Sequence, residues 1–577
     1  MTKLPASFKN IAEIALATLA AVCFAVSFGY TYGVDNQVEY MISSLRLLDP
    51  TIFHRDWYAM QTTHYHFSFK YLAAALIALN REGWAVAVFH TIIVSTGMMC
   101  LYWLFRTLVE RGRALPGFLL LVTIALITRT SGANASYVFD IMLQPSTIGS
   151  VAFFASVPFF AKGRWLESGV LMALSGLFHG NLLILMFLAY GVAHLMLGTR
   201  GLALRLVLQF VAPSLVLLLF VPIMLKSAGS PNAAASQDIY FNIRCPHHFI
   251  PGRAEGAYIP FVAWQMIGAG ASLHLLRTGG NARRLGALIG GLLFIIWSSL
   301  VLATLVQVKP VIQLFAWRLG PYCELLLQVL ACAGAVELFL DPGSIRRRGV
   351  VSFGLIITGV GFLAMRLGDT SKPALALLVL ALVGAVILAQ LGALAASNLA
   401  PTRMQSLLRR LWERGGPALA LVAAIGCVIP TAIPLLETVR QRSTLFKGFA
   451  KDETELYAWM RLHTPKDALF LTPPEIDKVR FQSQRAIVAD WKSCPFLPDE
   501  VLEWHQRMKD VTGRPGFAGA RDLDGYNSLD QSRLETLRAK YNLDYVVVRR
   551  GKEAALGDHR VAHANDAFVV LDLHAAR

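Results

Sequence analysis

The chain has 577 residues, of which 55% are hydrophobic and only 16% are charged. Soluble proteins average nearer a quarter charged residues, so the composition excludes an ordinary soluble domain and indicates a polytopic membrane protein. The net charge of +16 does not indicate nucleic-acid binding, because the excess Lys and Arg lies in short loops between apolar segments.

Apolar segments predict about 12 to 13 transmembrane helices. They lie near 11–33, 86–106, 115–128, 147–161, 168–197, 203–225, 258–276, 285–308, 319–341, 350–366, 374–396 and 417–437. Phe178-His179-Gly180-Asn181 interrupts 168–197 and predicts two short helices, meeting at a break that is buried or lines a cavity. Basic residues concentrate in alternate loops, which puts the N-terminus inside and the C-terminus outside if 168–197 crosses twice.

The loop after the first apolar segment, Gly33–Lys70, is acidic, aromatic and rich in histidine. Apolar residues recur at helical spacing from Asp35 to Leu48, which predicts a short helix lying along the membrane surface. Later aromatic residues predict a belt at the level of the lipid headgroups. These are Trp57, Tyr58, Tyr65, Phe67, Phe69 and Tyr71.

Asp35 is the candidate catalytic base, because it lies at the membrane boundary directly after the first helix. Glu39 and Asp56 are candidate supporting carboxylates in the same loop. The alternative reading of Asp35 is that it caps the helix that follows.

Candidate ligand-binding residues lie in several outer segments. His64 and His66 are separated by one residue. They could chelate a divalent metal if the backbone there is extended, or simply contact headgroups. Arg244, His247 and His248 in one loop could bind a phosphate, as could Arg318 at the edge of a late helix. The alternative for Arg318 is that it extends to the membrane surface. Cys245 and Cys494 could pair in an oxidising compartment.

The tail reads as a separate α/β domain, so the predicted division is a transmembrane domain, 1–440, with outer loops 33–85 and 226–256, and an α/β domain, 450–577. Predicted strands are 468–472, 486–490, 545–549 and 568–573, alternating with predicted helices 453–463, 499–509 and 531–541. Asp452 is the expected helix cap. No phosphate-binding loop or nucleophile elbow is present in it, which favours a supporting or gating role.

This layout resembles the GT-C superfamily of membrane glycosyltransferases, which includes protein O-mannosyltransferases and lipid A aminoarabinose transferases. The likeness comprises Asp35 after the first helix, Arg318 near the outer end of a late helix, and an outer C-terminal domain. Phrases of the tail, such as Arg485-Ala-Ile-Val-Ala-Asp-Trp491 and Asn542-Leu-Asp-Tyr-Val-Val-Val548, also look like the tails of bacterial relatives of that group.

The resemblance implies an inverting transferase in a bacterial inner membrane that moves a sugar from a polyprenyl-phosphate-linked donor to a glycan, lipid or protein acceptor. Asp35 would be the base, and Arg318 with Arg244 or His248 would hold the donor phosphate. The family's paired acidic motif is missing, because Asn36 follows Asp35, which favours a lone base without a metal cofactor. The alternative function is a non-catalytic transporter or an assembly component for polysaccharide export.

Overall fold

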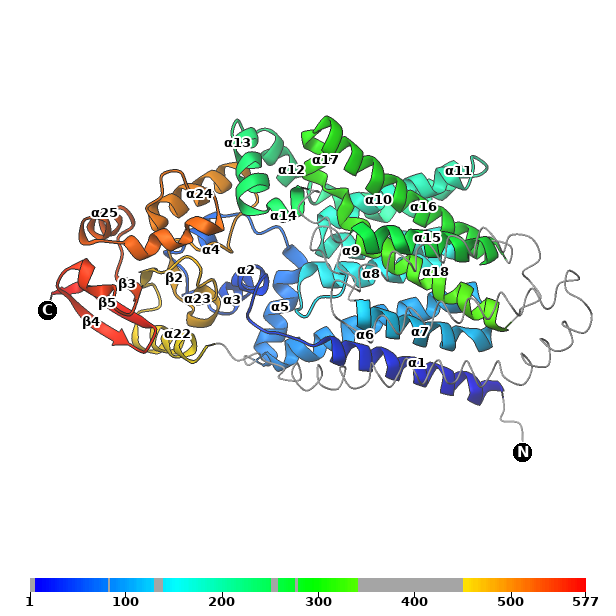
Figure 1. Cartoon of the computed structure of the whole chain (residues 1–577), viewed down its shortest axis with the longest axis horizontal. Coiled ribbons are helices and arrows are strands. Elements are labelled where there is room, and N and C mark those ends of the chain that lie inside the picture. Colours follow the sequence, from blue (N-terminus) through cyan, green and yellow to red (C-terminus); the bar gives the residue numbers. More distant parts are fainter. Residues whose placement is uncertain are drawn as a thin grey trace, which may run out of the picture.

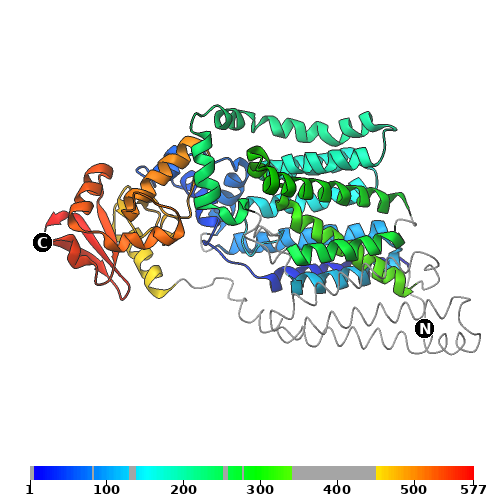
Figure 2. The same cartoon turned by 45° about the horizontal axis from the view of Figure 1, so that its top comes forward.

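The computed structural model of the protein describes residues 6–80, 83–128, 138–250, 258–275, 279–340 and 450–576. Long helices run side by side in a bundle, and a small α/β domain lies at one end of it (Figure 1). The start of α1, at Ala6, lies at the opposite end of the bundle, in both Figure 1 and Figure 2. The predicted fold class, a polytopic helical membrane protein with a C-terminal α/β domain, is confirmed.

The bundle is built from apolar helices of unequal length. They are α1 (Ala6–Phe28), α6 (Trp84–Leu108), α7 (Arg111–Thr128), α8 (Pro145–Ala161), α9 (Trp165–Phe178), α10 (Gly180–Met196), α11 (Leu202–Leu218), α12 (Val221–Ala228), α15 (Tyr258–Leu275), α16 (Gly280–Val301), α17 (Lys309–Leu314) and α18 (Gly320–Leu340), with short π and 3-10 turns η3 (Leu302–Val306) and η4 (Ala316–Leu319). Within the described residues, four spans are long and apolar enough to cross a membrane, or five if α11 and α12, bent by 60°, form one. The predicted segments 350–366, 374–396 and 417–437 lie outside the described residues, so the total number of crossings stays a prediction.

The predicted interruption of 168–197 is confirmed. α9 ends at Phe178, α10 begins at Gly180, and His179 between them is extended. His179 Nδ1 accepts a hydrogen bond from the Leu182 amide (3.3 Å), which satisfies one of the free amides at the start of α10. The Phe178 carbonyl accepts a hydrogen bond from His66 Nδ1 (3.1 Å), so the break faces the first outer loop.

Basic loops meet at the end of the bundle that is remote from the α/β domain. Asn281 Nδ2 donates to the Thr107 carbonyl (3.0 Å), and Arg284 Nη1 donates to the Ala161 carbonyl (3.1 Å). Three inter-helix loops that are far apart in sequence are therefore neighbours there, and they carry the arginines on which the orientation was predicted.

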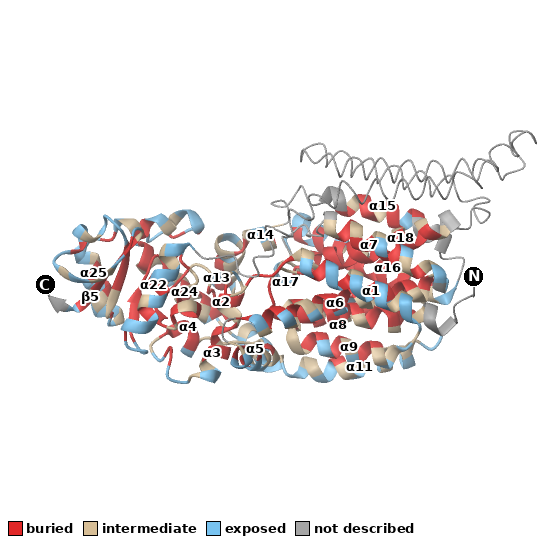
Figure 3. Cartoon of the chain, turned by 90° about the horizontal axis from the view of Figure 1, so that it is seen from below, coloured by how far each residue is buried: buried red, intermediate tan, exposed pale blue. Residues whose placement is uncertain are grey.

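Burial separates the interior of the bundle from its outer faces. α8 is buried along most of its length, and Figure 3 shows the same for much of α6 and α18. α11 instead exposes an apolar stripe at helical spacing that includes Leu204, Val207, Val211 and Leu215. An exposed apolar stripe of this kind suits contact with lipid.

The first outer loop contains four short helices, of which the first two divide the single helix expected from Asp35 to Leu48. They are α2 (Gln37–Tyr40), α3 (Ile42–Leu48), α4 (Trp57–Gln61) and α5 (Phe67–Leu79). The predicted stripe is helical, but it packs into protein: Val38, Met41 and Ile42 are buried in one cluster with Phe69 of α5 and Phe481 of the C-terminal domain. The prediction that this stripe lies on the membrane surface was wrong, because the α/β domain supplies its apolar partner.

The predicted aromatic belt is also wrong in part. Trp57 and Tyr58 are buried in the core of the α/β domain, and the guanidinium groups of Arg507 and Arg480 lie 4.8 and 5.2 Å from their respective ring centroids. Aromatic residues suit headgroups and protein interfaces equally well. The sequence pattern alone could not separate these two environments.

The C-terminal domain is a three-layer α/β/α sandwich. Its elements are α22 (Lys451–His463), β1 (Leu469–Leu471), α23 (Val479–Ser483), β2 (Ala486–Ile487), α24 (Pro498–Thr512), η6 (Ala520–Ser528), α25 (Gln531–Tyr541), β3 (Tyr545–Arg549), η7 (Glu553–Leu556), β4 (His559–Ala564) and β5 (Phe568–Ala576). The sheet order is β2-β1-β3-β5-β4, with β2, β1 and β3 parallel and the last two strands antiparallel. β4 was not predicted, since its edge position leaves most of its residues partly or fully exposed. The expected cap Asp452 lies inside the first turn of α22, whose N-cap is Ala450.

Alternate residues of each strand face opposite helical layers, as a pleated strand requires. Phe470 and Val547 are buried with α22, whereas Leu469, Leu471 and Val546 are buried with α24 and α25. In the described part of the loop that follows α12, the helices are α13 (Ala233–Asp238), η1 (Ile239–Arg244) and α14 (Pro246–Phe249), and α24 contacts α13 and η1. The α/β domain therefore packs on both outer loops.

Candidate functional site

The backbone around Asp35 is fixed against the segment that precedes α8. The Thr31 amide donates to the Ile141 carbonyl (2.7 Å), and Gln37 Nε2 donates to the Leu143 carbonyl (3.1 Å). Asn36 Nδ2 donates to Gln144 Oε1 (2.8 Å). Bonds on both sides of Asp35 thus hold it at the outer end of the bundle.

Asp35 itself is exposed and unpaired. Its φ of +49° is left-handed, a conformation that Asp and Asn adopt more readily than most residues. Among the described residues nothing forms a hydrogen bond or ion pair with its carboxylate, and the N-cap of α2 is Asn36. The capping alternative is therefore not supported, and the carboxylate is free to meet a substrate.

Two further carboxylates, which the sequence analysis missed, lie close to Asp35. Burial, together with the charge of Asp35, raises the pKa of Asp140 to about 6. Burial, with Asp490 and Asp35 nearby, likewise raises the pKa of Asp477 to about 6. Asp140 Oδ2 accepts a hydrogen bond from Gln144 (2.8 Å). Tertiary folding thus brings acids from two other segments near Asp35, and the role of Asp35 as a lone base stays a prediction.

Glu39 lies between cations and is partly buried. Burial raises its pKa from an ordinary value of 4.5 to about 7, although Lys492 and Arg244 nearby oppose the shift and Tyr58 forms a hydrogen bond with the carboxyl. A carboxyl with a pKa near neutrality can hold or release a proton under physiological conditions. Glu39 is thus better placed to exchange a proton than its predicted supporting role required.

We expect the raised pKa of Glu39 to make stability fall as the pH rises from about 4.5 to about 7. Over this window the folded chain holds a proton that the unfolded chain has released, which corresponds to at most about 3 kcal/mol. Thermal unfolding in detergent at pH 5 and pH 8 should show a smaller loss for Glu39→Gln than for wild type. The surface variant Glu455→Gln should follow wild type, and equal losses in all three proteins would contradict this expectation.

Arg244 joins the outer loop to the α/β domain. Its Nη2 donates to the Lys492 carbonyl (2.9 Å), its Nη1 lies 3.6 Å from Cys245 Sγ, and its guanidinium lies 5.1 Å from the Trp491 ring centroid. Its Nε is buried without a partner among the described residues. Arg244 therefore interacts electrostatically with Glu39 and keeps one N–H group, Nε, without a hydrogen-bond partner among the described residues. Cys245 and Cys494 are both buried free thiols here, so their pairing stays a prediction.

Arg318, on the bundle side, lies near Tyr40, the residue that follows Glu39 in α2. It lies in η4, partly buried, with its guanidinium 5.3 Å from the Phe315 ring centroid. Burial raises the pKa of Tyr40 and of Tyr65, and the charge of Arg318 opposes both shifts. Within the described residues its guanidinium has no hydrogen bond or ion pair. The structure thus brings Arg318 and Arg244 to neighbouring residues of α2, Tyr40 and Glu39.

The described contacts of His247 and His248 are with each other, Phe315 and Trp317 rather than with Glu39 or Tyr40. Their ring centroids lie 4.1 Å apart with the rings tilted by 49°, and the His248 carbonyl accepts a hydrogen bond from Trp317 Nε1 (2.9 Å). That bond ties the loop of Arg244 to the loop of Arg318. The two histidines thus support the site's framework, and their phosphate contact stays a prediction.

The two candidate metal ligands each engage a backbone carbonyl. His64 Nε2 donates to the Tyr58 carbonyl (3.3 Å) and His66 Nδ1 donates to the Phe178 carbonyl. Burial lowers the pKa of each histidine to about 4. In the part of the chain that the structure describes, no three His, Cys, Asp or Glu side chains gather as a metal site would need. A metal held by this pair gains no third ligand from these residues.

Asp56 is a structural residue rather than a member of the cluster around Glu39. It is fully buried, caps α4 through the Ala59 amide (2.9 Å), and forms an ion pair with Arg480 Nε (2.7 Å). Arg480 also forms an ion pair with Asp490. These three residues, the Asp56–Arg480–Asp490 triad, fasten the first outer loop to the α/β domain.

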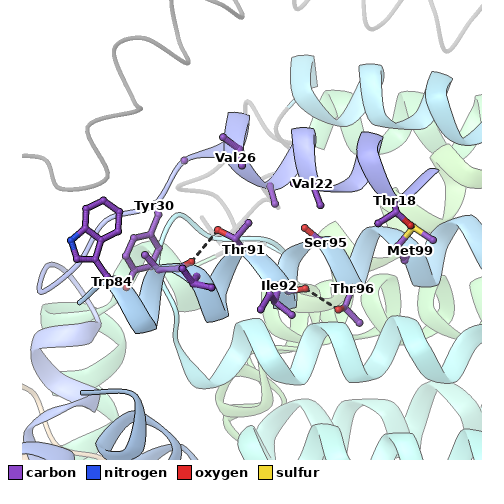
Figure 4. Close-up of a pocket in the computed structure, with 14 residues that line it drawn as sticks. Thr18, Val22, Val26, Tyr30, Trp84, Thr91, Ile92, Ser95, Thr96 and Met99 are labelled. Atoms are coloured by element: carbon purple, nitrogen blue, oxygen red, sulfur yellow. Dashed lines mark hydrogen bonds between the residues drawn. The ribbon is translucent and has the colours of Figure 1, made fainter. Parts of the chain in front are cut away.

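An apolar groove runs along the bundle toward the Asp35 segment. It has a volume of about 620 Å³ and lies between α1 and α6. Val22 and Val26 line one side and Ile92 lines the other, while Tyr30 lies at its outer end (Figure 4). The Tyr30 hydroxyl lies 3.4 Å from Gln37 Nε2, which places the outer end of the groove beside the first outer loop.

Comparison with known proteins gives one partial family match. A family model described as a domain of unknown function (DUF6798) matches residues 451–511, from α22 into α24. No curated protein matches the chain.

Several solved structures match the chain over most of its length at low identity. The apo oligosaccharyltransferase of Archaeoglobus fulgidus is 12% identical over 95% of this chain and 71% of its own, with a TM-score of 0.47. ArnT from Cupriavidus metallidurans bound to undecaprenyl phosphate is 13% identical over 98% of each chain, with a TM-score of 0.47. AglB from Archaeoglobus fulgidus with an inhibitory peptide and a dolichol-phosphate is 13% identical over 94% of this chain and 70% of its own, with a TM-score of 0.45.

Proposed function

We propose that the protein is an inverting membrane glycosyltransferase that uses a polyprenyl-phosphate-linked sugar. One observation supports the proposal: the exposed carboxylate of Asp35 directly precedes α2, and the charge of Arg318, which has no hydrogen bond or ion pair among the described residues, acts on Tyr40 of α2. An exposed carboxylate is accessible to a substrate, and a partly buried guanidinium without a hydrogen bond gains from an anionic ligand. A hydroxyl acceptor and an anionic donor together would use both.

In this reaction Asp35 removes the proton from the acceptor hydroxyl. The hydroxyl oxygen forms a bond to the anomeric carbon of the sugar, and the bond from that carbon to the phosphate oxygen breaks. The electron pair leaves with the polyprenyl phosphate, and Arg318 with Arg244 stabilises its charge. A single displacement from the opposite face inverts the anomeric configuration, which needs one base.

The groove between α1 and α6 suits the lipid part of the donor. Its lining is mainly apolar, and Val26, Val88 and Ile92 are more than half exposed. An isoprenoid chain lying there would carry its phosphate toward the first outer loop. The basic loops at the other end of the bundle support a cytoplasmic N-terminus, so that the site and the α/β domain face the periplasm of a bacterial cell.

The proposal is tested by release of polyprenyl phosphate from a panel of polyprenyl-phosphate hexoses by the purified protein in detergent. We expect turnover of at least one donor, and we expect Arg318→Gln to raise its KM about 10- to 100-fold through loss of a charged contact. Arg164→Gln, at the opposite end of the bundle in an exposed pair with Glu167, is the matched control and should behave like wild type. A wild-type protein that neither binds nor turns over any donor would show that the proposed function is wrong.

A further inference from the structure

We propose that Lys492 of the α/β domain binds the phosphate of the lipid-linked donor, so that this domain completes the site rather than only covering it. The inference rests on the proposed function and adds a residue from a second domain. Lys492 lies on the loop between β2 and α24, more than 170 residues after Arg318 in the sequence.

The backbone of Lys492 is fixed on both sides. Its carbonyl accepts hydrogen bonds from Arg244 Nη2 and from the Cys494 amide (both 2.9 Å). Before it, the Trp491 amide donates to the Pro474 carbonyl (2.9 Å); after it, the Ser493 amide donates to Asp490 Oδ1 (2.6 Å). A backbone held this firmly presents its side chain in a narrow range of directions, which favours a preorganised contact.

The Asp56–Arg480–Asp490 triad extends this support to the bundle side. Asp490 stands two residues before Lys492 and is held by Arg480, which Asp56 of the first outer loop also holds. Trp504 Nε1 donates to the Asp490 carbonyl (3.0 Å). The loop of Lys492 is therefore positioned relative to the segment of Asp35 and Glu39 and not only within its own domain.

The ammonium group of Lys492 is partly buried and has no hydrogen bond or ion pair among the described residues. Its charge reaches groups from three elements: Glu39 of α2, Asp140 of the segment before α8, and Asp477 of its own domain. A lysine whose only task was to neutralise one of these acids would form a direct pair with it. An unpaired ammonium on the residue whose carbonyl Arg244 binds instead suits an anion shared with Arg244.

The carboxyl group of Glu39 explains how an anion could enter among these acids. Lys492 and Arg244 are the cations whose charge acts on Glu39. When a phosphate takes the place of the Glu39 charge between them, the carboxyl can take up a proton. Lys492 and Arg244 then interact with the phosphate, and the neutral Glu39 carboxyl does not repel it.

The test measures equilibrium binding of undecaprenyl phosphate, and of the uncharged undecaprenol, to the full-length protein in detergent. We expect Lys492→Met to weaken binding of the phosphate about 10-fold or more and to leave binding of the alcohol unchanged. Lys492→Arg, which keeps the charge, should stay within about threefold of wild type. Lys552→Met, an exposed lysine of the same domain, is the matched control and should equal wild type.

A purely structural Lys492 gives a different result. If the lysine only balances the nearby acids, Lys492→Met shifts the pH profile of turnover to higher pH, because it removes the charge that opposes their raised pKa values. The affinity for undecaprenyl phosphate then equals that of wild type, and the inference is overturned while the proposed function stands. If wild type binds neither undecaprenyl phosphate nor a sugar-linked donor, the proposed function fails and the inference fails with it.

Discussion

Asp35→Asn is expected to lower turnover of a polyprenyl-phosphate sugar by at least about 100-fold while leaving the donor KM nearly unchanged. An amide cannot take the proton of the acceptor hydroxyl, and general base catalysis typically contributes 10²- to 10⁴-fold. The substitution should leave the backbone unchanged, since Asn tolerates the left-handed φ of +49° as well as Asp does. Initial rates over a range of donor concentrations separate kcat from KM.

Asp49→Asn is the matched control in the same outer loop. The Asp49 carboxylate forms an ion pair with Lys466 at 2.8 Å on the protein surface, and such pairs contribute little. Its turnover should equal that of wild type. If Asp35→Asn also turns over like wild type, Asp35 is not the base, and Glu39, with its pKa near 7, becomes the residue to test in its place.

Arg480→Met is expected to destabilise the attachment of the α/β domain by about 3–5 kcal/mol, because it leaves Asp56 and Asp490 buried without a counter-charge. Both carboxylates are fully buried, and Arg480 itself is 1% exposed. Protease sensitivity of the folded protein and thermal unfolding in detergent both report the loss. We expect cleavage in the α/β domain at a lower temperature than in wild type.

Lys478→Met is the control for this prediction. Lys478 lies two residues away and forms a partly exposed pair with Glu453 at 3.0 Å, which should be worth about 1 kcal/mol or less. Combining Arg480→Met with Asp56→Asn and Asp490→Asn removes the buried charges together and should restore part of the lost stability. A single variant as stable as wild type would mean that the triad does not hold the domain.

The α/β domain shows where patterns of sequence suffice. Ala468–Thr472 and Tyr545–Arg549 are apolar runs between helical segments, and each contains an observed strand, β1 and β3. The unpredicted strand β4 has no fully buried residue and combines His559, Arg560 and His563 with only one large apolar residue, Val561, so hydrophobicity gives little signal for it. Its partner β5 supplies the hydrogen bonds that make it a strand.

The outer loop shows where such patterns fail. The stripe containing Val38 and Met41 correctly predicts helix, yet its burial against Phe481 depends on a segment more than 400 residues later. Asp56 looked like a chemical group because it is acidic and lies near histidines. Its ion pair with Arg480 gives it a structural role that no local pattern indicates.

The sequence by itself determined the class of protein, the break at His179 and the candidates Asp35, Arg244 and Arg318, because hydropathy, helix interruption and charge are local properties of the chain. Only the tertiary structure decided which charges meet. Asp477 and Lys492 of the α/β domain lie more than 300 residues after Asp140, and burial and electrostatic interaction depend on distance in space. Burial in the folded chain likewise gives Glu39, predicted as a supporting residue, a pKa near 7 close to two cations.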